Sequence, residues 1–215
     1  MRRNPLLLAL ALLAPSHPAC TRERPPLTRT ALHQLHVTQG ALSEAADGRL
    51  AVEVSKVRAV VPGLDDATAA ELRFTYLGPT RVQKALASGE SRQQLGLKLR
   101  AQDGCNVVYV MWRLSPKAGL HVSVKSNPQN HTSAECGNRG YTRVRAQREV
   151  PVPELVPGAS HTLYAEWEGP ALRVQVDGVL AWEGTLPPEA LDFEGPVGLR
   201  TDNGRFELEL LTQQR

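Results

Sequence analysis

Basic and aromatic side chains recur at alternate positions of several short segments between residues 94 and 147. The set contains six permanent cations, two phenols and one imidazole: Lys98, Arg100, Tyr109, Arg113, His121, Lys125, Tyr141, Arg143 and Arg145. No carboxylate shares these alternate positions. If the segments are strands of one sheet, its outer, concave face is basic and carries aromatic stacking surfaces, which suits a sugar polymer bearing carboxylate or sulfate groups. In the alternative interpretation the strands divide between two sheets, and the cations only solvate both outer faces.

The same set holds the loose ingredients of a polysaccharide lyase. Such an enzyme needs a Tyr or His base beside an Arg or Asn that neutralises a uronate carboxylate. The residues of the required types are Tyr109, Arg113, His121, Tyr141 and Arg143. The chain has no serine nucleophile elbow, phosphate-binding loop or dinucleotide fingerprint. The sequence therefore favours binding without catalysis and keeps an enzyme as the alternative.

The three cysteines predict one disulfide. Cys20 follows the N-terminal apolar segment, which leaves Cys105 and Cys136 as an even pair. In an oxidising compartment this pair is expected to form a disulfide that closes a loop of about thirty residues. Two buried free thiols remain the alternative.

No cofactor is predicted. Neither a Cys-x-x-Cys nor a His-x-x-x-His spacing occurs, and two cysteines cannot complete a tetrahedral metal site. Asp103, Asp202 and Asn203 offer oxygen ligands of the kind that Ca²⁺ takes, but three scattered ligands are too few to support a calcium site.

Alternation of apolar and polar residues predicts the strands that position these side chains. Leu95, Leu97 and Leu99 fall on one face of an extended segment and Lys98 on the other. Segments of this kind recur along the chain at 50–57, 71–77, 95–100, 108–114, 120–125, 141–147, 162–167, 172–176, 179–182, 197–200 and 206–210. They make about ten or eleven strands, which a two-sheet sandwich satisfies better than a closed barrel. The sequence 64–72 is the best candidate for a short helical turn, and Asp177-Gly178 predicts a two-residue hairpin.

The C-terminal third resembles the central hairpins of concanavalin A-like or laminin-G-like jelly rolls. The resemblance rests on the runs HTLYAEWEGPALRVQVDGVLAWEG (161–184), GPVGLRTDNG (195–204) and RFELEL (205–210). It implies an all-β, two-sheet antiparallel jelly-roll sandwich. It is nearly silent on chemistry, because this fold hosts lectins, adhesive modules, glucanases and polysaccharide lyases.

A glucanase of this fold is expected to carry the family pattern Glu-x-Asp-x-x-Glu on one strand, because two carboxylates must flank the scissile bond. The pairs Glu207/Glu209 and Glu166/Glu168 have the required alternation. Both lack the rest of the pattern, so we interpret them as solvated strand faces.

The first twenty residues have the organisation of a secretory signal. Arg2 and Arg3 precede the apolar run Leu6–Leu13, which is too short to span a bilayer. Cys20, directly after the cleavage position, resembles the lipidated cysteine of bacterial lipoproteins. Plain secretion after cleavage near Ala19 is the alternative, and an accidental cysteine is a third.

The whole chain carries 25 Lys and Arg against 22 Asp and Glu, and the balance falls from +3 to +1 without Arg2 and Arg3. This charge gives no support to nucleic-acid binding. The predicted organisation is a signal peptide at 1–20, a tether at 21–30 and a β-sandwich at 31–215. We therefore expect an exported, lipid-anchored module of the cell envelope that binds a glycan or another envelope component. A polysaccharide hydrolase or lyase, and a purely structural envelope role, are the alternatives.

Overall fold

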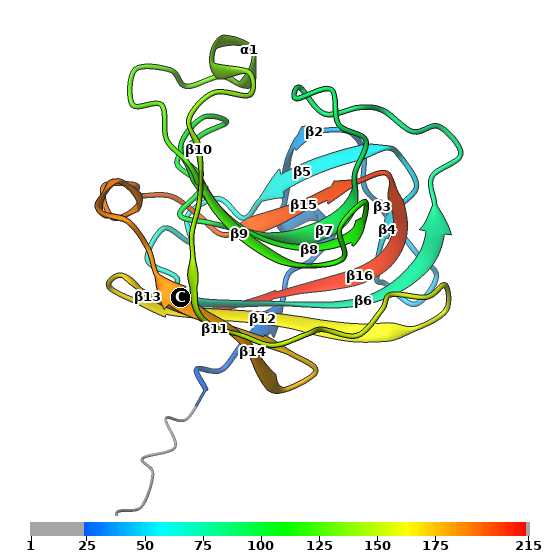
Figure 1. Ribbon diagram of the computed structural model, residues 1–215. Helices are drawn as coiled ribbons and strands as arrows, with labels where there is room; N and C mark the ends of the chain where they lie inside the picture. The colour runs from blue at the N-terminus through cyan, green and yellow to red at the C-terminus, as the bar shows by residue number, and fades with distance from the viewer. Residues whose placement is uncertain (1–23, 214–215) are drawn as a thin grey trace, which may run out of the picture.

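A computed structural model describes residues 24–213, so the predicted signal peptide and Cys20 lie outside the described residues. Within 24–213 the chain forms two antiparallel sheets packed face to face, which confirms the predicted sandwich (Figure 1). No helix in this part is long and apolar enough to cross a membrane.

The nine-stranded sheet, called the A sheet, has the order β11-β14-β13-β12-β6-β16-β4-β3, and β1 pairs with β16. Its strands are β1 (Thr28–Arg29), β3 (Ser43–Glu44), β4 (Leu50–Val52), β6 (Ala69–Pro79), β11 (Ala146–Glu149), β12 (Ser160–Glu168), β13 (Ala171–Val176), β14 (Val179–Thr185) and β16 (Gly204–Thr212).

The seven-stranded sheet, called the B sheet, has the order β10-β9-β8-β7-β15-β5-β2. Its strands are β2 (His36–Gln39), β5 (Lys56–Val60), β7 (Gln93–Leu99), β8 (Val107–Ser115), β9 (Gly119–Lys125), β10 (Tyr141–Arg143) and β15 (Gly198–Asp202). The helix α1 spans Ser133–Cys136, and single 3-10 turns span Leu32–Gln34 and Pro188–Ala190.

Two predicted strands each divide between the sheets. Segment 50–57 contributes β4 to the A sheet and β5 to the B sheet, and segment 141–147 contributes β10 to the B sheet and β11 to the A sheet. Between β4 and β5 the buried positions change from even numbers, Leu50 and Val52, to odd numbers, Val57 and Ala59, whereas the alternation continues unchanged from β10 to β11. Segment 64–72 contains turns followed by β6 rather than a helix. β1 pairs Thr28 with Thr212, so the A sheet includes part of the segment expected to be a tether.

The core lies between the two sheets and is built from the inward residues of both. Phe74 of β6 meets Trp112 of β8 edge to face, with ring centroids 5.6 Å apart, and packs against Phe206 of β16 at 6.1 Å. All three rings are buried. Edge-to-face pairs add to the stability that buried apolar area provides, so these rings lock the two sheets in register.

The predicted hairpin at Asp177-Gly178 is confirmed. Both residues have positive φ, 51° and 80°, and Val176 pairs directly with Val179. This is the backbone that a two-residue turn of this type requires.

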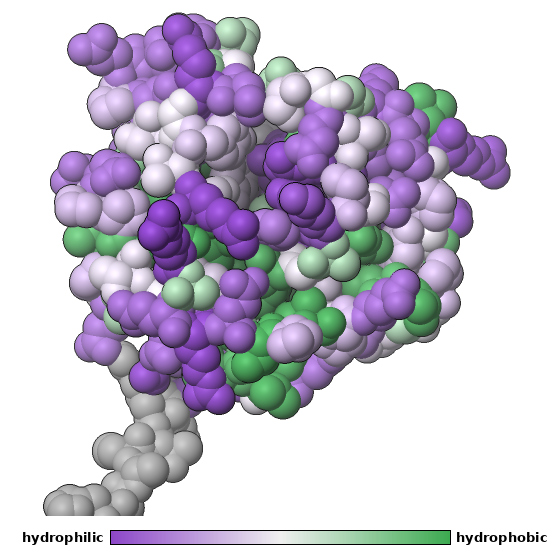
Figure 2. All heavy atoms as spheres, in the orientation of Figure 1, coloured by the Kyte–Doolittle hydropathy of each residue, from purple (hydrophilic) through white to green (hydrophobic). Residues whose placement is uncertain are grey.

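Two long connections rise on either side of the outer face of the B sheet (Figure 1). Residues 80–92 join β6 to β7, and residues 126–140, which include α1, join β9 to β10. Figure 2 shows the surface hollowed between these two projections. The outer face of the B sheet is therefore the floor of a hollow.

Two glycines at the centre of this floor lie very close to the backbone of neighbouring strands. A Cβ added to Gly96 would lie 2.1 Å from the carbonyl oxygen of Val110, and one added to Gly198 would lie 2.1 Å from that of Ala59. Gly96 pairs with Arg200 on one side and Met111 on the other. Glycine inside a strand marks such a close backbone approach.

We expect Gly96→Ala to destabilise the fold by at least about 2 kcal/mol, because its Cβ meets backbone that cannot move aside. Gly63→Ala is the control. It has positive φ but nothing within 4 Å of the added Cβ, so its cost is limited to about 1 kcal/mol of backbone strain. Urea denaturation measures both, and an equal loss in the two variants would contradict the prediction.

Candidate functional site

Seven of the nine predicted site residues lie on the outer face of the B sheet. The pairing Lys98↔Tyr109↔Ser123↔Arg143 runs across β7, β8, β9 and β10, and it sets the face for the alternate positions of each strand. The seven are Lys98, Tyr109, Arg113, His121, Lys125, Tyr141 and Arg143. For these residues the single-sheet interpretation is correct, and division between two sheets is not.

Arg100 and Arg145 are not on this face. Arg100 follows β7 with φ 48°, and its Nη2 donates to the carbonyl of Leu191, 2.8 Å away. The left-handed backbone ends the alternation that placed it with Lys98. Arg145 lies between β10 and β11, where the chain leaves the B sheet for the A sheet.

Sequence reasoning missed four members of the face. Arg58 comes from β5 and Arg200 and Asp202 from β15, and Gln94 lies on β7 beside Asp202. The signal for Arg200 and Asp202 was their alternation with the apolar positions of the last-but-one strand. Asp202 adds a carboxylate to this face from outside segment 94–147. Together the predicted and the missed residues form the basic face: Arg58, Gln94, Lys98, Tyr109, Arg113, His121, Lys125, Tyr141, Arg143, Arg200 and Asp202.

Asp202 is fully buried and bridges two arginines. It accepts hydrogen bonds from Arg58 Nη2 at 2.6 Å, Arg200 Nε at 2.9 Å and Gln94 Nε2 at 2.7 Å. Burial alone would raise the pKa of Asp202, but Arg200 and Arg58 hold it below its ordinary value. The carboxylate is thus charged, and its lone pairs are engaged within the protein.

Aromatic rings and cations alternate across the middle of the face. The guanidinium of Arg200 lies 4.8 Å from the ring centroid of Tyr109, which stacks on Tyr141 at 6.1 Å with 21° between the planes. Lys125 Nζ also lies near Tyr141, 5.3 Å from the centroid of its ring. Tyr141 is 40% exposed, whereas Tyr109 is buried, so Tyr141 is the ring that a ligand can reach.

Lys98 is buried without an anionic partner. It is 5% exposed, and among residues 24–213 its ammonium has no hydrogen bond or ion pair. Burial lowers the pKa of Lys98 to about 8, and the positive charges of Arg58 and Arg200 act in the same direction. The floor of the hollow therefore holds an ammonium that no carboxylate of residues 24–213 pairs directly, although Asp103 attracts its charge.

A second cationic group surrounds His121. Burial lowers the pKa of His121 to about 4, and Arg113, Arg143 and Arg92 lower it further, against the carbonyl of Lys117. The Nε of Arg113 is buried without a hydrogen-bond partner. His121 is consequently neutral at pH 7 and can act as a base or as a hydrogen-bonding group.

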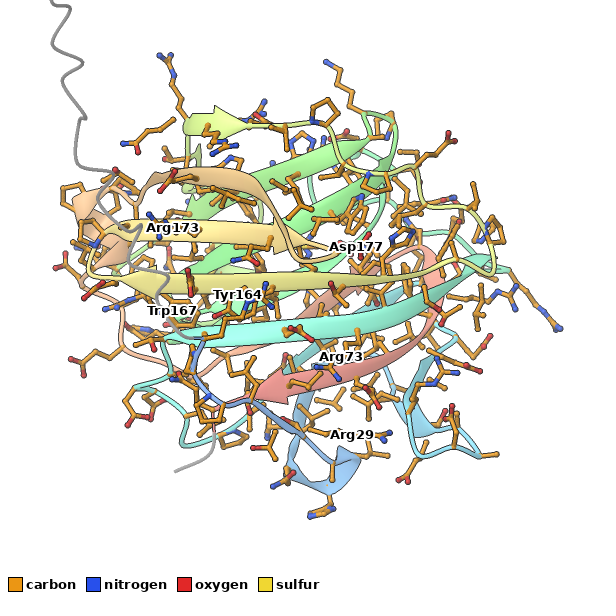
Figure 3. All side chains as sticks on the ribbon, turned by 90° about the horizontal axis from the view of Figure 1, so that it is seen from below. Arg29, Arg73, Tyr164, Trp167, Arg173 and Asp177 are labelled. Carbon is orange, nitrogen blue, oxygen red and sulfur yellow. A yellow bond between two sulfur atoms is a disulfide. The ribbon has the colours of Figure 1, made fainter. Side chains whose placement is uncertain are left out.

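The outer face of the A sheet differs, because four arginines on this side of the molecule have carboxylate partners. Figure 3 shows Arg29, Arg73 and Arg173 on this side of the molecule. The pairs are Arg29–Glu209 at 3.2 Å, Arg73–Glu71 at 2.5 Å, Arg173–Glu183 at 2.9 Å and Arg49–Glu207. In the described part of the chain, Lys98, Arg113, Lys125 and Arg143 of the basic face have no such ion pair.

The predicted disulfide is confirmed and braces one side of the hollow. Cys105, between β7 and β8, is bonded to Cys136 of α1. Lys125 Nζ donates to the carbonyl of Gly104, 3.1 Å away, beside this bridge. The disulfide therefore fixes the backbone that holds Lys125 under Tyr141.

Residues 24–213 contain no group of three or more His, Cys, Asp or Glu side chains arranged to hold a metal ion. Two of the oxygen-bearing residues considered for Ca²⁺ are engaged elsewhere. Asp103 accepts hydrogen bonds from Asn106 and faces His131 Nδ1 at 2.9 Å, and Asp202 is held by Arg58 and Arg200.

We expect Lys98→Met to stabilise the protein at pH 7 by roughly 1 to 3 kcal/mol. Folding lowers the pKa of Lys98 from its ordinary 10.5 to about 8, so the unfolded chain holds the proton more tightly than the folded one. The penalty is complete below the folded pKa and disappears as the pH rises through 10.5. The measurement is the difference in unfolding free energy between variant and wild type from pH 7 upward. A difference that does not narrow with rising pH would refute it.

No known protein family matches the sequence, and no curated protein matches it either. The fold is similar to that of the carbohydrate-binding module CBM66 from Bacillus subtilis, with TM-score 0.55, 13% identity and coverage of 81% of this chain and 91% of that one. It is also similar to a variant of the Emp46p carbohydrate recognition domain (TM-score 0.50, 13% identity, 83% and 88% coverage). A third is the Crh5 transglycosylase in complex with NAG (TM-score 0.50, 14% identity, 86% and 80% coverage). These likenesses show a jelly-roll sandwich of the kind found in carbohydrate-binding modules, lectins and glycan-processing enzymes.

Proposed function

We propose that this chain is an exported, lipid-anchored β-sandwich module that binds an acidic glycan on its basic face without cleaving it. The observation that carries the proposal is the charge of that face. In the described part of the chain, six cations of the basic face stand against the single carboxylate of Asp202: Arg58, Lys98, Arg113, Lys125, Arg143 and Arg200.

Buried or half-buried cations without counterions are unfavourable, and an anionic ligand relieves that cost. Arginine binds carboxylate and sulfate oxygens through two parallel hydrogen bonds, and Arg113 and Arg143 have donors available for this. The exposed ring of Tyr141 offers a surface on which a sugar ring can stack. A polymer with anionic groups and apolar sugar faces meets both requirements.

Three further observations support export and a glycan partner. The Arg2-Arg3 and apolar segment before Cys20 has the pattern of a lipoprotein-type signal. The Cys105–Cys136 disulfide is typical of oxidising compartments. The similarity of the fold to CBM66, a carbohydrate-binding module, supports a glycan as the ligand.

Binding is favoured over hydrolysis because the paired carboxylates of a glycosidase are missing from the hollow. Glu207 is engaged by Arg49, and Glu166 accepts a hydrogen bond from Tyr164 at 2.9 Å. Both belong to the A sheet. Asp202 is paired with two arginines and is the only carboxylate that residues 24–213 contribute to the basic face as defined above.

The test measures the affinity of the protein for polygalacturonate, dextran sulfate and neutral dextran at low and high salt. We expect salt-sensitive binding to an acidic polymer, no binding to dextran and no new reducing or unsaturated ends. Arg113→Ala and Arg143→Ala should each weaken binding about tenfold. Arg173→Ala, on the A sheet, is the matched control and should bind like the wild type. Equal effects of all three substitutions, or equal binding to dextran, would overturn the proposal.

A polysaccharide lyase is the second candidate, favoured by the neutral His121 between Arg113 and Arg143. In this reaction a base removes the proton next to a uronate carboxylate that an arginine neutralises. The electron pair forms a carbon–carbon double bond, and the glycosidic oxygen leaves with a proton supplied by an acid such as Tyr141. The same residues that bind the polymer would then cleave it.

If the lyase candidate is correct, unsaturated ends accumulate when the wild-type protein is incubated with a polyuronate. The ultraviolet absorbance of their carbon–carbon double bonds detects them. His121→Ala and Tyr141→Phe should abolish the product while leaving the melting temperature nearly unchanged. Loss of folding in parallel with loss of product would count against a catalytic role.

A further inference from the structure

Lys98 differs from the other buried cations of the basic face in having no partner. Lys125 is 3% exposed and donates to the carbonyl of Gly104. Arg58 and Arg200 share Asp202. Lys98 is 5% exposed, yet no carbonyl, hydroxyl or carboxylate of residues 24–213 accepts a hydrogen bond from it. The ammonium of a lysine with so little exposed surface is normally paired.

The side chain of Lys98 has largely apolar surroundings. Its neighbours across the strands are Tyr109 and Gly198. Tyr109 belongs to a small apolar cluster on the same face, with Met111, Ala101, Val107 and Val60. The side chain thus emerges through apolar packing into the floor of the hollow.

The charged and titratable groups around Lys98 come from several elements. Arg58 on β5 and Arg200 on β15 repel its charge, and Asp103, between β7 and β8, attracts it. Tyr109 lies beside it on β8, and burial raises the pKa of that phenol. The balance among these groups is positive, so an added anion is favoured.

We propose that Lys98, beside Arg200, holds one anionic oxygen group of the bound glycan, and that the ammonium takes up a proton as this group binds. The group is a uronate carboxylate or a sulfate ester, since both present charged oxygens to the same donors. This inference rests on the proposed function and specifies which residue carries the selectivity for acidic sugars.

The direction of the pH effect follows from the charge balance. In the free protein the pKa of Lys98 is about 8, and a negative group in contact with the ammonium raises it. Binding therefore favours the protonated form. Affinity should be nearly full at about pH 7 and about fivefold weaker at about pH 9, where roughly one free molecule in eleven keeps the proton and the neutral form binds about tenfold more weakly. Carboxylate and sulfate groups stay ionised throughout this range, so the ligand does not cause the change.

Three variants isolate the role of Lys98 in the affinity for polygalacturonate and dextran sulfate. Lys98→Met removes the charge, and binding should fall about tenfold at about pH 7 and lose its pH dependence. Lys98→Arg keeps a charge that does not titrate, so binding should persist at about pH 9. Lys117→Met, in the exposed β8–β9 turn, is the control and should behave like the wild type. Tighter binding of polygalacturonate identifies the group as a carboxylate, and tighter binding of dextran sulfate identifies it as a sulfate ester.

A second measurement does not depend on the polymer. Lysine labelled with ¹³C reports the pKa of Lys98 by NMR, with Lys98→Met assigning the signal. Sodium sulfate or galacturonate should raise this pKa in a saturable manner. If the pKa rises but no polymer binds, the anion site stands and the proposed function fails. If polymers bind while Lys98→Met matches the wild type in affinity and pH dependence, the proposed function stands and this inference is overturned. Failure of both measurements rejects both.

Discussion

The buried contact between Asp202, Arg58 and Arg200 is the interaction on which the candidate site depends. It ties β5 to β15, and through Gln94 it reaches β7, so three adjacent strands share one carboxylate. The contact also turns Arg200 so that its guanidinium covers Tyr109. A single carboxylate neutralises a single positive charge, however. The arrangement that orders the face also leaves its remaining cations without an internal counterion.

The predictable part of this site comes from neighbouring segments of the chain. β7, β8 and β9 are consecutive antiparallel strands, so alternation alone places Lys98, Tyr109 and His121 on one face. Arg58 and Asp202 are 144 residues apart in sequence, and no local pattern indicates that β5 and β15 are neighbours. The pairing of distant strands is decided by how the two sheets close around the core. Periodicity could therefore place Arg200 and Asp202 on an outward face of their strand, but it could not show that Arg58 and Lys98 share that face.

The boundary where the chain changes sheets accounts for the error at Arg145. Val144 is buried and Arg145 exposed, so alternation continues smoothly while the chain crosses from β10 to β11. A period of two reports which side chains face a core, and the two sheets share one core. Arg145 is therefore exposed, as its position in the alternation predicts, but it does not lie on the B sheet. Arg100 failed for a different reason, because its positive φ rotates the side chain away from the face at the end of β7.

Lys98 connects the stability of the fold to what the hollow can bind. An apolar side chain at this position would pack against Tyr109 and Met111 without an electrostatic penalty, and the neighbouring Gly198 shows that the floor tolerates little bulk. The A sheet, with arginine–glutamate pairs across its outer surface, demonstrates that the same chain can compensate exposed charge. The electrostatic penalty on the B sheet is thus confined to the hollow and comes from positive charge. A ligand with negative groups recovers that penalty as binding free energy, whereas a neutral polymer of the same shape does not, so selectivity for charge arises from the instability of the empty site.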